Sequence, residues 1–287
     1  MHYFRSSLAA FLSVVMLVVA VAKADEAPKP RGEKITLEMR LKKGDQKSLI
    51  YKMDLTSSAS VQGQVFDVAM KMGMYLGTKV EDVDAQGLHT LKLSYDRITM
   101  DMVSPVFAMA YDSKEPEKAA KNPAFDMFNA MIGQAITMKV QPDGTTKEVL
   151  GIDELAKKLQ EKAAPGMDVK QQLEGMKSAF EQFAVYPGKP VDIGDTWNRK
   201  IKMAADPNMP MDIDADYTLI DRKNGTAIVK MKGTITSTNG MKGTNIGTLQ
   251  IDEATGWISG GEMTMELGGE LQGATVKVKG KSTISDK

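Results

Sequence analysis

The feature that most constrains how this chain can fold is a strict alternation of apolar and polar residues over long segments. From Ile35 to Leu41 every second residue is apolar, and the residues between them are charged or polar. Successive side chains of a strand point to opposite faces of a sheet, so this spacing predicts a strand with one buried face. The same alternation recurs over Leu49–Leu55, Phe66–Met74 and Leu91–Tyr95.

Turn-forming residues separate these segments. Lys43-Gly44-Asp45 precedes the second segment, and Ala85-Gln86-Gly87 precedes the fourth. After Tyr95 the apolar residues change parity and continue from Ile98, which predicts a β-bulge near Asp96-Arg97. Because the successive strands are joined by short connections, an antiparallel meander is the simplest arrangement.

The middle of the chain carries helical patterns. Asn122-Pro123 predicts a helix start and Gly133 its end. A hairpin around Pro142-Asp143-Gly144 and a short helix over residues 152–159 follow. A further amphipathic helix is predicted to lie on the sheet, because its apolar residues recur at intervals of three and four: Val169, Leu173, Met176, Phe180 and Phe183.

The last third of the chain returns to alternation, broken by glycine-containing turns such as Asn224-Gly225 and Thr255-Gly256. The predicted strands there are Trp197–Met203, Ile213–Ile220, Ala227–Ile235, Gly247–Ile251, Trp257–Leu267 and Gly273–Ile284.

These elements predict an α+β fold dominated by antiparallel sheet. A curved sheet or half-barrel packed on amphipathic helices would use them well. We expect one domain over residues 34–287, with a β-unit at 34–112, a helical and hairpin insert at 113–185, and a β-unit at 186–287. Gly44-Asp45 and Gly194-Asp195 open the two β-units, so either the units are related or two meanders resemble each other by chance.

The first 24 residues have the pattern of a secretory signal peptide. Arg5 precedes an apolar run from Leu8 to Ala22, and Ala22-Lys23-Ala24 forms a small-residue cleavage site. The run of 15 residues is shorter than the ~20 needed to span a bilayer. We therefore expect cleavage after Ala24, a disordered leader at 25–33, a periplasmic or secreted protein, and no membrane span after cleavage.

Charge and cysteine content exclude several classes of function. Removing residues 1–24 takes away two basic residues and no acidic one, which leaves 35 basic and 37 acidic side chains. A nearly neutral surface argues against a nucleic acid or an anionic membrane as the partner. The chain has no cysteine, so its stability must come from packing without disulfides.

Methionine is the most distinctive candidate for function, with 22 in the chain. Several pairs stand two residues apart, which places them on one face of a strand. Thioethers could bind Cu(I), but these lie in apolar strands, where filling of a core is the simpler interpretation. Flexible methionines also suit a groove for varied apolar ligands. The predicted groove residues are Met70, Met72, Met74, Phe180 and Phe183.

Other patterns give no support for catalysis or metal binding. Asp212, Asp214 and Asp216 resemble the start of an EF-hand loop, but that loop needs glycine and glutamate where Tyr217 and Lys223 stand. A solvated acidic face is preferred, and a looser Ca²⁺ site that includes Asp206 is the alternative. His89 is the one histidine after the leader, and we expect it to be hydrogen-bonded or exposed. We predict no catalytic residues, no metal, no cofactor and no enzymatic activity.

Short turn-forming motifs carry a resemblance to a known family. The chain resembles a family of exported bacterial proteins classified as a domain of unknown function, from about Ile35 to the C-terminus. The resemblance implies export and a β-rich fold, and it transfers no catalytic residue. A weaker similarity of fold links the predicted sheet to periplasmic lipoprotein carriers. The motifs are Leu41-Lys42-Lys43-Gly44-Asp45, Tyr95-Asp96, Ala110-Tyr111-Asp112-Ser113, Pro187 with Pro190-Val191, Gly194-Asp195-Thr196-Trp197, and Ile251-Asp252 with Thr255-Gly256.

The expected function is non-enzymatic binding of an apolar ligand or a partner chain in the cell envelope. The alternative is a structural or adhesive envelope component with a fully packed core. Its function would then lie on loops such as Ser57–Gln64 and Ser113–Lys121. Lysine in place of Met72 separates the two, because it should abolish ligand uptake in a grooved protein and unfold a packed one.

Overall fold

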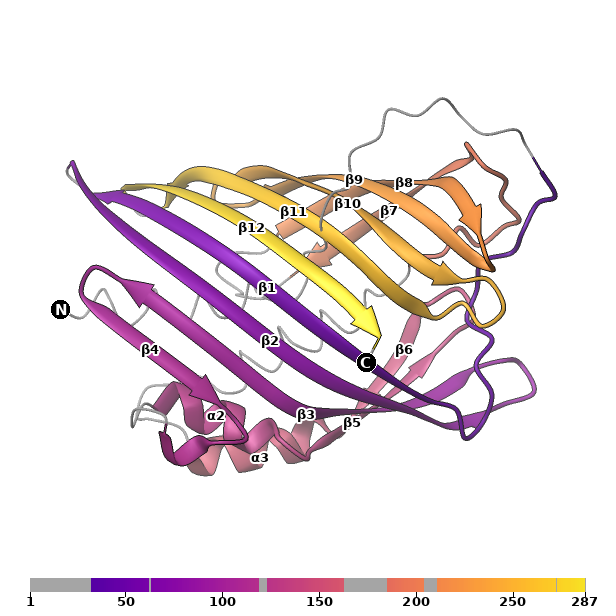
Figure 1. Cartoon of the computed structure of the whole chain (residues 1–287), viewed down its shortest axis with the longest axis horizontal. Helices are drawn as coiled ribbons and strands as arrows, with labels where there is room; N and C mark the ends of the chain where they lie inside the picture. Colours follow the sequence, from indigo (N-terminus) through magenta and orange to yellow (C-terminus); the bar gives the residue numbers. More distant parts are fainter. Residues whose placement is uncertain are drawn as a thin grey trace.

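In the computed structural model of this chain, the described residues are 32–61, 63–118, 123–162, 185–203, 211–271 and 273–286. They form one large antiparallel sheet that curves along its width (Figure 1). The strands of the first half are β1 Gln46–Val61, β2 Gln64–Val83, β3 His89–Ser104, β4 Phe107–Asp112, β5 Ala135–Val140 and β6 Thr146–Leu150. Those of the second half are β7 Thr196–Met203, β8 Met211–Lys223, β9 Thr226–Ser237, β10 Lys242–Asp252, β11 Ile258–Leu271 and β12 Ala274–Asp286.

The order across the sheet is β6-β5-β3-β2-β1-β12-β11-β10-β9-β8-β7, and β4 also pairs with β3. Neighbours in sequence are therefore neighbours in space almost everywhere, as the predicted meander requires. The pairing of β1 with β12 joins the two halves into one sheet. Among the described residues β6 and β7 have no pairing with each other, so the sheet is open.

The fold is predominantly β, which corrects the predicted α+β class. The described helices are short: α2 Pro123–Met131, α3 Ile152–Lys162 and the single 3-10 turn η2 Pro116–Lys118. The predicted hairpin around Pro142-Asp143-Gly144 is confirmed as β5–β6, and its two strands extend the same sheet, so that most of the described residues belong to one sheet. The predicted amphipathic helix from Val169 to Phe183 lies outside the described residues.

Helix α2 lies near the edge of the sheet beside β4 and begins at Pro123, as predicted (Figure 1). The Tyr111 ring of β4 stacks on Phe125 at 4.9 Å between centroids and contacts Phe128 at 5.5 Å. The Tyr111 hydroxyl donates to Oδ1 of Asn129 at 2.8 Å. The apolar stripe of α2 is therefore held by aromatic packing, with a polar contact at its rim.

The predicted bulge in β3 is confirmed. Tyr75 of β2 faces Arg97, whereas the next residue, Leu76, faces Tyr95. Asp96 is thus the extra residue, and its insertion restores the burial of Ile98 after the change in parity.

The predicted strand over Ile35–Leu41 is wrong. Residues 32–41 form an extended segment, here called the N-terminal strap, in which only Ile35 makes a bridge, with Val191. Its backbone bonds go to separate parts of the fold: Met39 donates to Pro142 at 2.7 Å and Arg40 donates to Thr255 at 2.8 Å. The alternation arises because Leu37 and Leu41 are buried, although no strand pairs with the strap along its length.

The two turns that precede β1 and β7 have the same pattern of hydrogen bonds. Gly44 donates to the carbonyl of Val80 at 2.9 Å, and Val80 donates back to Asp45 at 2.9 Å. Gly194 donates to the carbonyl of Leu219 at 2.7 Å, and Leu219 donates back to Asp195 at 3.1 Å. Both glycines have positive φ, 91° and 92°, which a side chain would oppose.

Candidate functional site

The buried face of the curved sheet, here called the inner face, carries a row of side chains that crosses five strands. Met100 of β3 faces Met72 of β2, which faces Met53 of β1. Met53 faces Ser282 of β12, which faces Met263 of β11. All five are buried. Methionines of β3, β2, β1 and β11 therefore lie in one row, which is interrupted by the hydroxyl of Ser282 on β12.

A second row runs parallel to the first. Met102 faces Met70, and Met70 faces Leu55. Across β12 the row continues through Gly280 to Met265, and then to Asn245 of β10. Burial of each methionine side chain contributes about 1.5–3 kcal/mol, so these rows also stabilise the sheet.

The structure brings the predicted residues Met70, Met72 and Met74 together on this face, at exposed fractions of 1%, 5% and 8%. Met74 faces Tyr51 of β1 and Ile98 of β3. The other two predicted groove residues, Phe180 and Phe183, lie outside the described residues.

Among the described residues of the inner face, the side chains of Asn245 and Ser282 have no hydrogen-bond partner. Asn245 is 0% exposed, and both its Nδ2 and its Oδ1 are unpaired. Ser282 is 1% exposed, and its hydroxyl is also unpaired. A buried polar group without a partner costs about 1–3 kcal/mol, so each side chain lowers the stability of the unliganded fold.

The adjacent positions of the sheet offer no side chain that could hydrogen-bond to the amide of Asn245. Across the strands it faces Met265 and Gly233. Along β10 the nearest inner-face positions are Gly243 and Gly247. Three of the four adjacent inner-face positions therefore hold glycine, which has no side chain that could reach the amide.

Sequence reasoning missed Asn245 because the strand was predicted to begin at Gly247, whereas β10 begins at Lys242. Ser282 was inside a predicted strand but was not considered as a site. The alternation of side chains along a strand would have been the available signal. Asn245 and Ser282 stand an even number of positions from the buried residues Leu249 and Val278, which indicates the same buried face.

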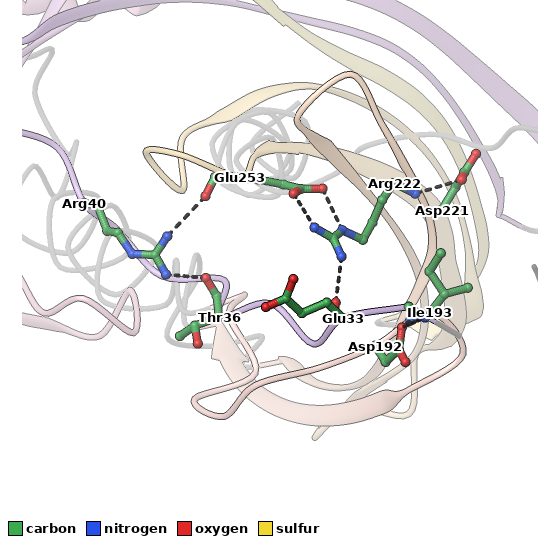
Figure 2. Close-up of polar contacts among 9 residues, drawn as sticks. Glu33, Thr36, Arg40, Asp192, Ile193, Asp221, Arg222 and Glu253 are labelled. Carbon is green, nitrogen blue, oxygen red and sulfur yellow. Dashed lines mark hydrogen bonds and ion pairs between the residues drawn. The ribbon is translucent and has the colours of Figure 1, made fainter. Parts of the chain in front are cut away.

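One end of the sheet is tied by the N-terminal strap and an ionic network (Figure 2). The Arg222 guanidinium donates two hydrogen bonds to the carboxylate of Glu253, at 3.0 and 2.8 Å, and a third to the carbonyl of Glu33 at 2.7 Å. Arg40 of the strap donates to the carbonyls of Glu253 and Thr36 at 3.2 and 2.5 Å. The bond to Glu253 raises the pKa of Arg222. The network joins β8, the β10–β11 turn and the strap.

The strap also packs tightly on Gly256. A Cβ there would lie 1.9 Å from the carbonyl oxygen of Glu38, and the φ of Gly256 is +72°. Tyr186 donates its hydroxyl to the carbonyl of Gly256 at 2.6 Å. A cleft of about 310 Å³ lies beside the strap and contains none of the predicted site residues. It is lined by Thr36, Leu37, Glu38, Gln141, Pro142, Asp143, Gly188, Lys189 and Pro190.

His89 is buried, and its two ring nitrogens differ. Nε2 is 3.1 Å from the carbonyl of Leu41, at the end of the strap, whereas Nδ1 has no partner. The expectation of a hydrogen-bonded histidine therefore holds for one nitrogen.

The acidic strand residues Asp212, Asp214 and Asp216 are exposed. Asn198 donates to Asp214 at 2.6 Å and to Asp216 at 3.0 Å, and its bond lowers the pKa of Asp214. In the described part of the chain no group of three or more acidic or histidine side chains is placed to hold a metal ion. Asp206 lies outside the described residues.

Residues 86–258 match the Family of unknown function DUF6263. The chain belongs to this family. The resemblance inferred from the turn motifs is confirmed at the level of a family of unknown function. In this DUF6263 protein the matched segment runs from the β2–β3 turn to the start of β11, so it includes Asn245, whereas Ser282 lies beyond it.

No curated protein matches the DUF6263 chain. Among solved structures it is similar to lipovitellin, in a study of lipid–protein interactions, with 9% identity and a TM-score of 0.52. The match covers 86% of this chain and 25% of lipovitellin, so the DUF6263 protein spans about a quarter of that chain. An outer membrane channel from Pseudomonas putida F1 has 12% identity and a TM-score of 0.33, with 87% and 97% of the two chains covered.

The similarity to lipovitellin shows a shared fold. Within the described residues of the DUF6263 protein, no helix is both long and apolar enough to cross a membrane.

Proposed function

We propose that this DUF6263 protein binds an apolar ligand with acyl chains on the inner face of its sheet. The protein would act as a carrier or receptor without catalysing a reaction. The observation that carries the proposal is the row of buried side chains across β3, β2, β1, β12 and β11, in which four strands supply methionine and β12 supplies Ser282: Met100, Met72, Met53, Ser282 and Met263.

Methionine suits this role because its side chain is unbranched and its sulfur is polarizable. Such side chains can change rotamer to accept hydrocarbon chains of different shape, which branched aliphatic residues do less readily. A core that needed only stability would be served equally well by leucine or isoleucine, which specify one packing arrangement more strictly.

The fold supports the same proposal. Lipovitellin, whose structure concerns lipid–protein interactions, has a similar fold over most of this chain. We propose that the DUF6263 protein uses the corresponding curved sheet for a lipid-like ligand. The N-terminal pattern supports an exported protein that meets this ligand in the cell envelope.

The experiment that tests the proposal is native mass spectrometry of the mature protein purified from its own cell envelope, followed by denaturation and solvent extraction. A retained apolar molecule of definite mass supports the proposal and identifies the ligand class. A protein that carries no such molecule, and that fails to bind N-phenyl-1-naphthylamine saturably after purification, contradicts it and favours a structural envelope component.

Two matched variants test whether the ligand lies on the inner face. Met72→Lys introduces a charge into the first methionine row, and Ala69→Lys introduces the same charge at an exposed position of the same strand. We expect Met72→Lys to abolish probe binding and Ala69→Lys to leave it unchanged. Circular dichroism reports whether each variant folds. If Met72→Lys unfolds, Met72→Gln provides a milder test, and unchanged probe binding in a folded variant would refute the assignment.

A further inference from the structure

We propose that the ligand is a neutral amphiphile whose polar group hydrogen-bonds to Asn245 and Ser282 while its acyl chain lies on the methionine rows. This inference rests on the proposed function and adds the chemistry of the ligand's head group. Asn245 and Ser282 are both nine-tenths or more buried on the inner face, at 0% and 1% exposure, and neither has a partner.

The unpaired atoms define what the head group must offer. Nδ2 of Asn245 needs an acceptor, and its Oδ1 needs a donor. The hydroxyl of Ser282 can donate and accept. A pure hydrocarbon satisfies none of these atoms, and an ether or simple ester offers only acceptors. A head group with both a carbonyl and a hydroxyl or amide N–H satisfies all of them.

The surroundings argue against a charged head group. The inner-face positions around Asn245 are Met265 and three glycines, and Ser282 faces Met53 and Met263. None of these residues carries a positive charge that could pair with a buried carboxylate or phosphate. Burying an unpaired ion is far more costly than burying a neutral group, so the site favours a neutral ligand.

The spacing of Asn245 and Ser282 fits one head group that carries two hydrogen-bonding groups. Asn245 faces Met265, Met265 faces Gly280, and Ser282 stands two residues beyond Gly280 on β12. Their Cα atoms are therefore roughly 12 Å apart, from a strand spacing of about 4.8 Å and a rise of about 3.4 Å per residue. Both side chains point to the same face, so their separation stays close to this value. Two hydrogen bonds of about 2.9 Å leave roughly 6 Å, which an extended glyceryl ester spans between its carbonyl oxygen and its terminal hydroxyl.

The backbone around Asn245 is closely packed. A Cβ at Gly233 would lie 3.2 Å from both Ile213 Cγ2 and Met231 Cε, and a Cβ at Gly243 would lie 2.0 Å from the carbonyl oxygen of Glu266. This packing requires glycine at Gly243, and neither glycine supplies a polar group to Asn245.

The test compares three ligands whose hydrocarbon chains have the same length. Displacement of N-phenyl-1-naphthylamine from the full mature protein is measured with 1-monooleoylglycerol, with oleate and with 1-octadecene. We expect 1-monooleoylglycerol to bind at least about tenfold more tightly than either of the others, because each hydrogen bond contributes roughly three- to tenfold in affinity.

The variants Asn245→Leu and Ser282→Ala should each reduce the preference for 1-monooleoylglycerol by roughly three- to tenfold. The preference is expressed as the ratio of the affinity for 1-monooleoylglycerol to that for 1-octadecene, so a change in apolar binding that is common to both ligands cancels. Thermal unfolding of the unliganded protein should show equal or greater stability, because an unpaired polar group is removed. Asn198→Leu on the exposed face is the matched control and should change neither the preference nor probe binding.

The outcomes separate the two proposals. If the wild-type protein binds no probe and no lipid, the proposed function fails. If it binds the probe but shows no preference for 1-monooleoylglycerol, or if Asn245→Leu keeps that preference, the head-group inference fails while the apolar site stands. Preference for oleate would instead indicate a charged head group and would also overturn the inference.

Discussion

Replacement of Gly256 by alanine is expected to loosen the N-terminal strap and to destabilise the protein well beyond the usual cost of a side chain at positive φ. The φ of Gly256 is +72°, and an alanine Cβ would lie 1.9 Å from the carbonyl oxygen and 2.5 Å from the carbonyl carbon of Glu38. Real Cβ contacts of this kind stay beyond 3.0 Å, so the strap backbone must move by more than an ångström.

That movement disrupts specific bonds. Arg40 donates its amide to Thr255 at 2.8 Å, directly beside the clash. Tyr186 donates its hydroxyl to Gly256 itself at 2.6 Å. The left-handed conformation costs about 1–2 kcal/mol for alanine, and each lost hydrogen bond costs about 0.5–1.5 kcal/mol. We therefore expect Gly256→Ala to lower the free energy of unfolding by about 3–4 kcal/mol.

Gly225→Ala is the matched control. Its φ is +74°, nearly the same, but no atom lies within 4 Å of the added Cβ. We expect this variant to lose only the conformational term of about 1–2 kcal/mol. Urea unfolding followed by circular dichroism measures both values, and the difference of about 2 kcal/mol corresponds to roughly 4–8 °C in Tm. Equal losses in the two variants would show that the strap does not pack on Gly256 as described.

Two further predictions concern turns. Asp252 accepts bonds from the Thr255 hydroxyl and amide, and the hydroxyl bond in particular lowers its pKa below the ordinary 3.8. Asp252→Ala should lower stability by about 1–2 kcal/mol at pH 7. The ionised form is the one favoured in the folded state, so this contribution is present above pH 3.8 and is lost as the pH falls below it. Urea unfolding across this range should show the difference shrinking, and a constant difference would contradict the assignment. Asp45 and Asp195 accept the amides of Lys42 and Asp192 at 2.8 and 3.0 Å. Alanine at either should cost about 1 kcal/mol, and the double variant should show the sum, because the turns share no partner; a markedly non-additive double variant would reveal coupling between them.

Much of the fold could be predicted because the local signals agree with the tertiary structure. The alternation over Leu49–Leu55 lies in β1, and Pro142-Asp143-Gly144 forms the β5–β6 turn. The bulge at Asp96 followed from the change in parity alone. These features depend on the period of a strand and on turn chemistry, both of which are local.

Other features could not be predicted because they depend on distant partners. The alternation of Ile35–Leu41 looks like a strand, yet the strap bonds to Val191, Pro142 and Thr255 in turn. The pairing of β1 with β12 joins the two halves of the sheet over more than 200 positions, and no local pattern specifies it.

The candidate site also depends partly on local sequence and partly on distant partners. The sequence by itself determined that methionines alternate along the strands and share one face, because side-chain direction in a strand has period two. Only the tertiary structure decided that these faces join into rows across five strands, since register between strands depends on the whole sheet. It also decided that Asn245 and Ser282 lie unpaired among them, because burial and the absence of a partner are properties of the surroundings and not of the residue.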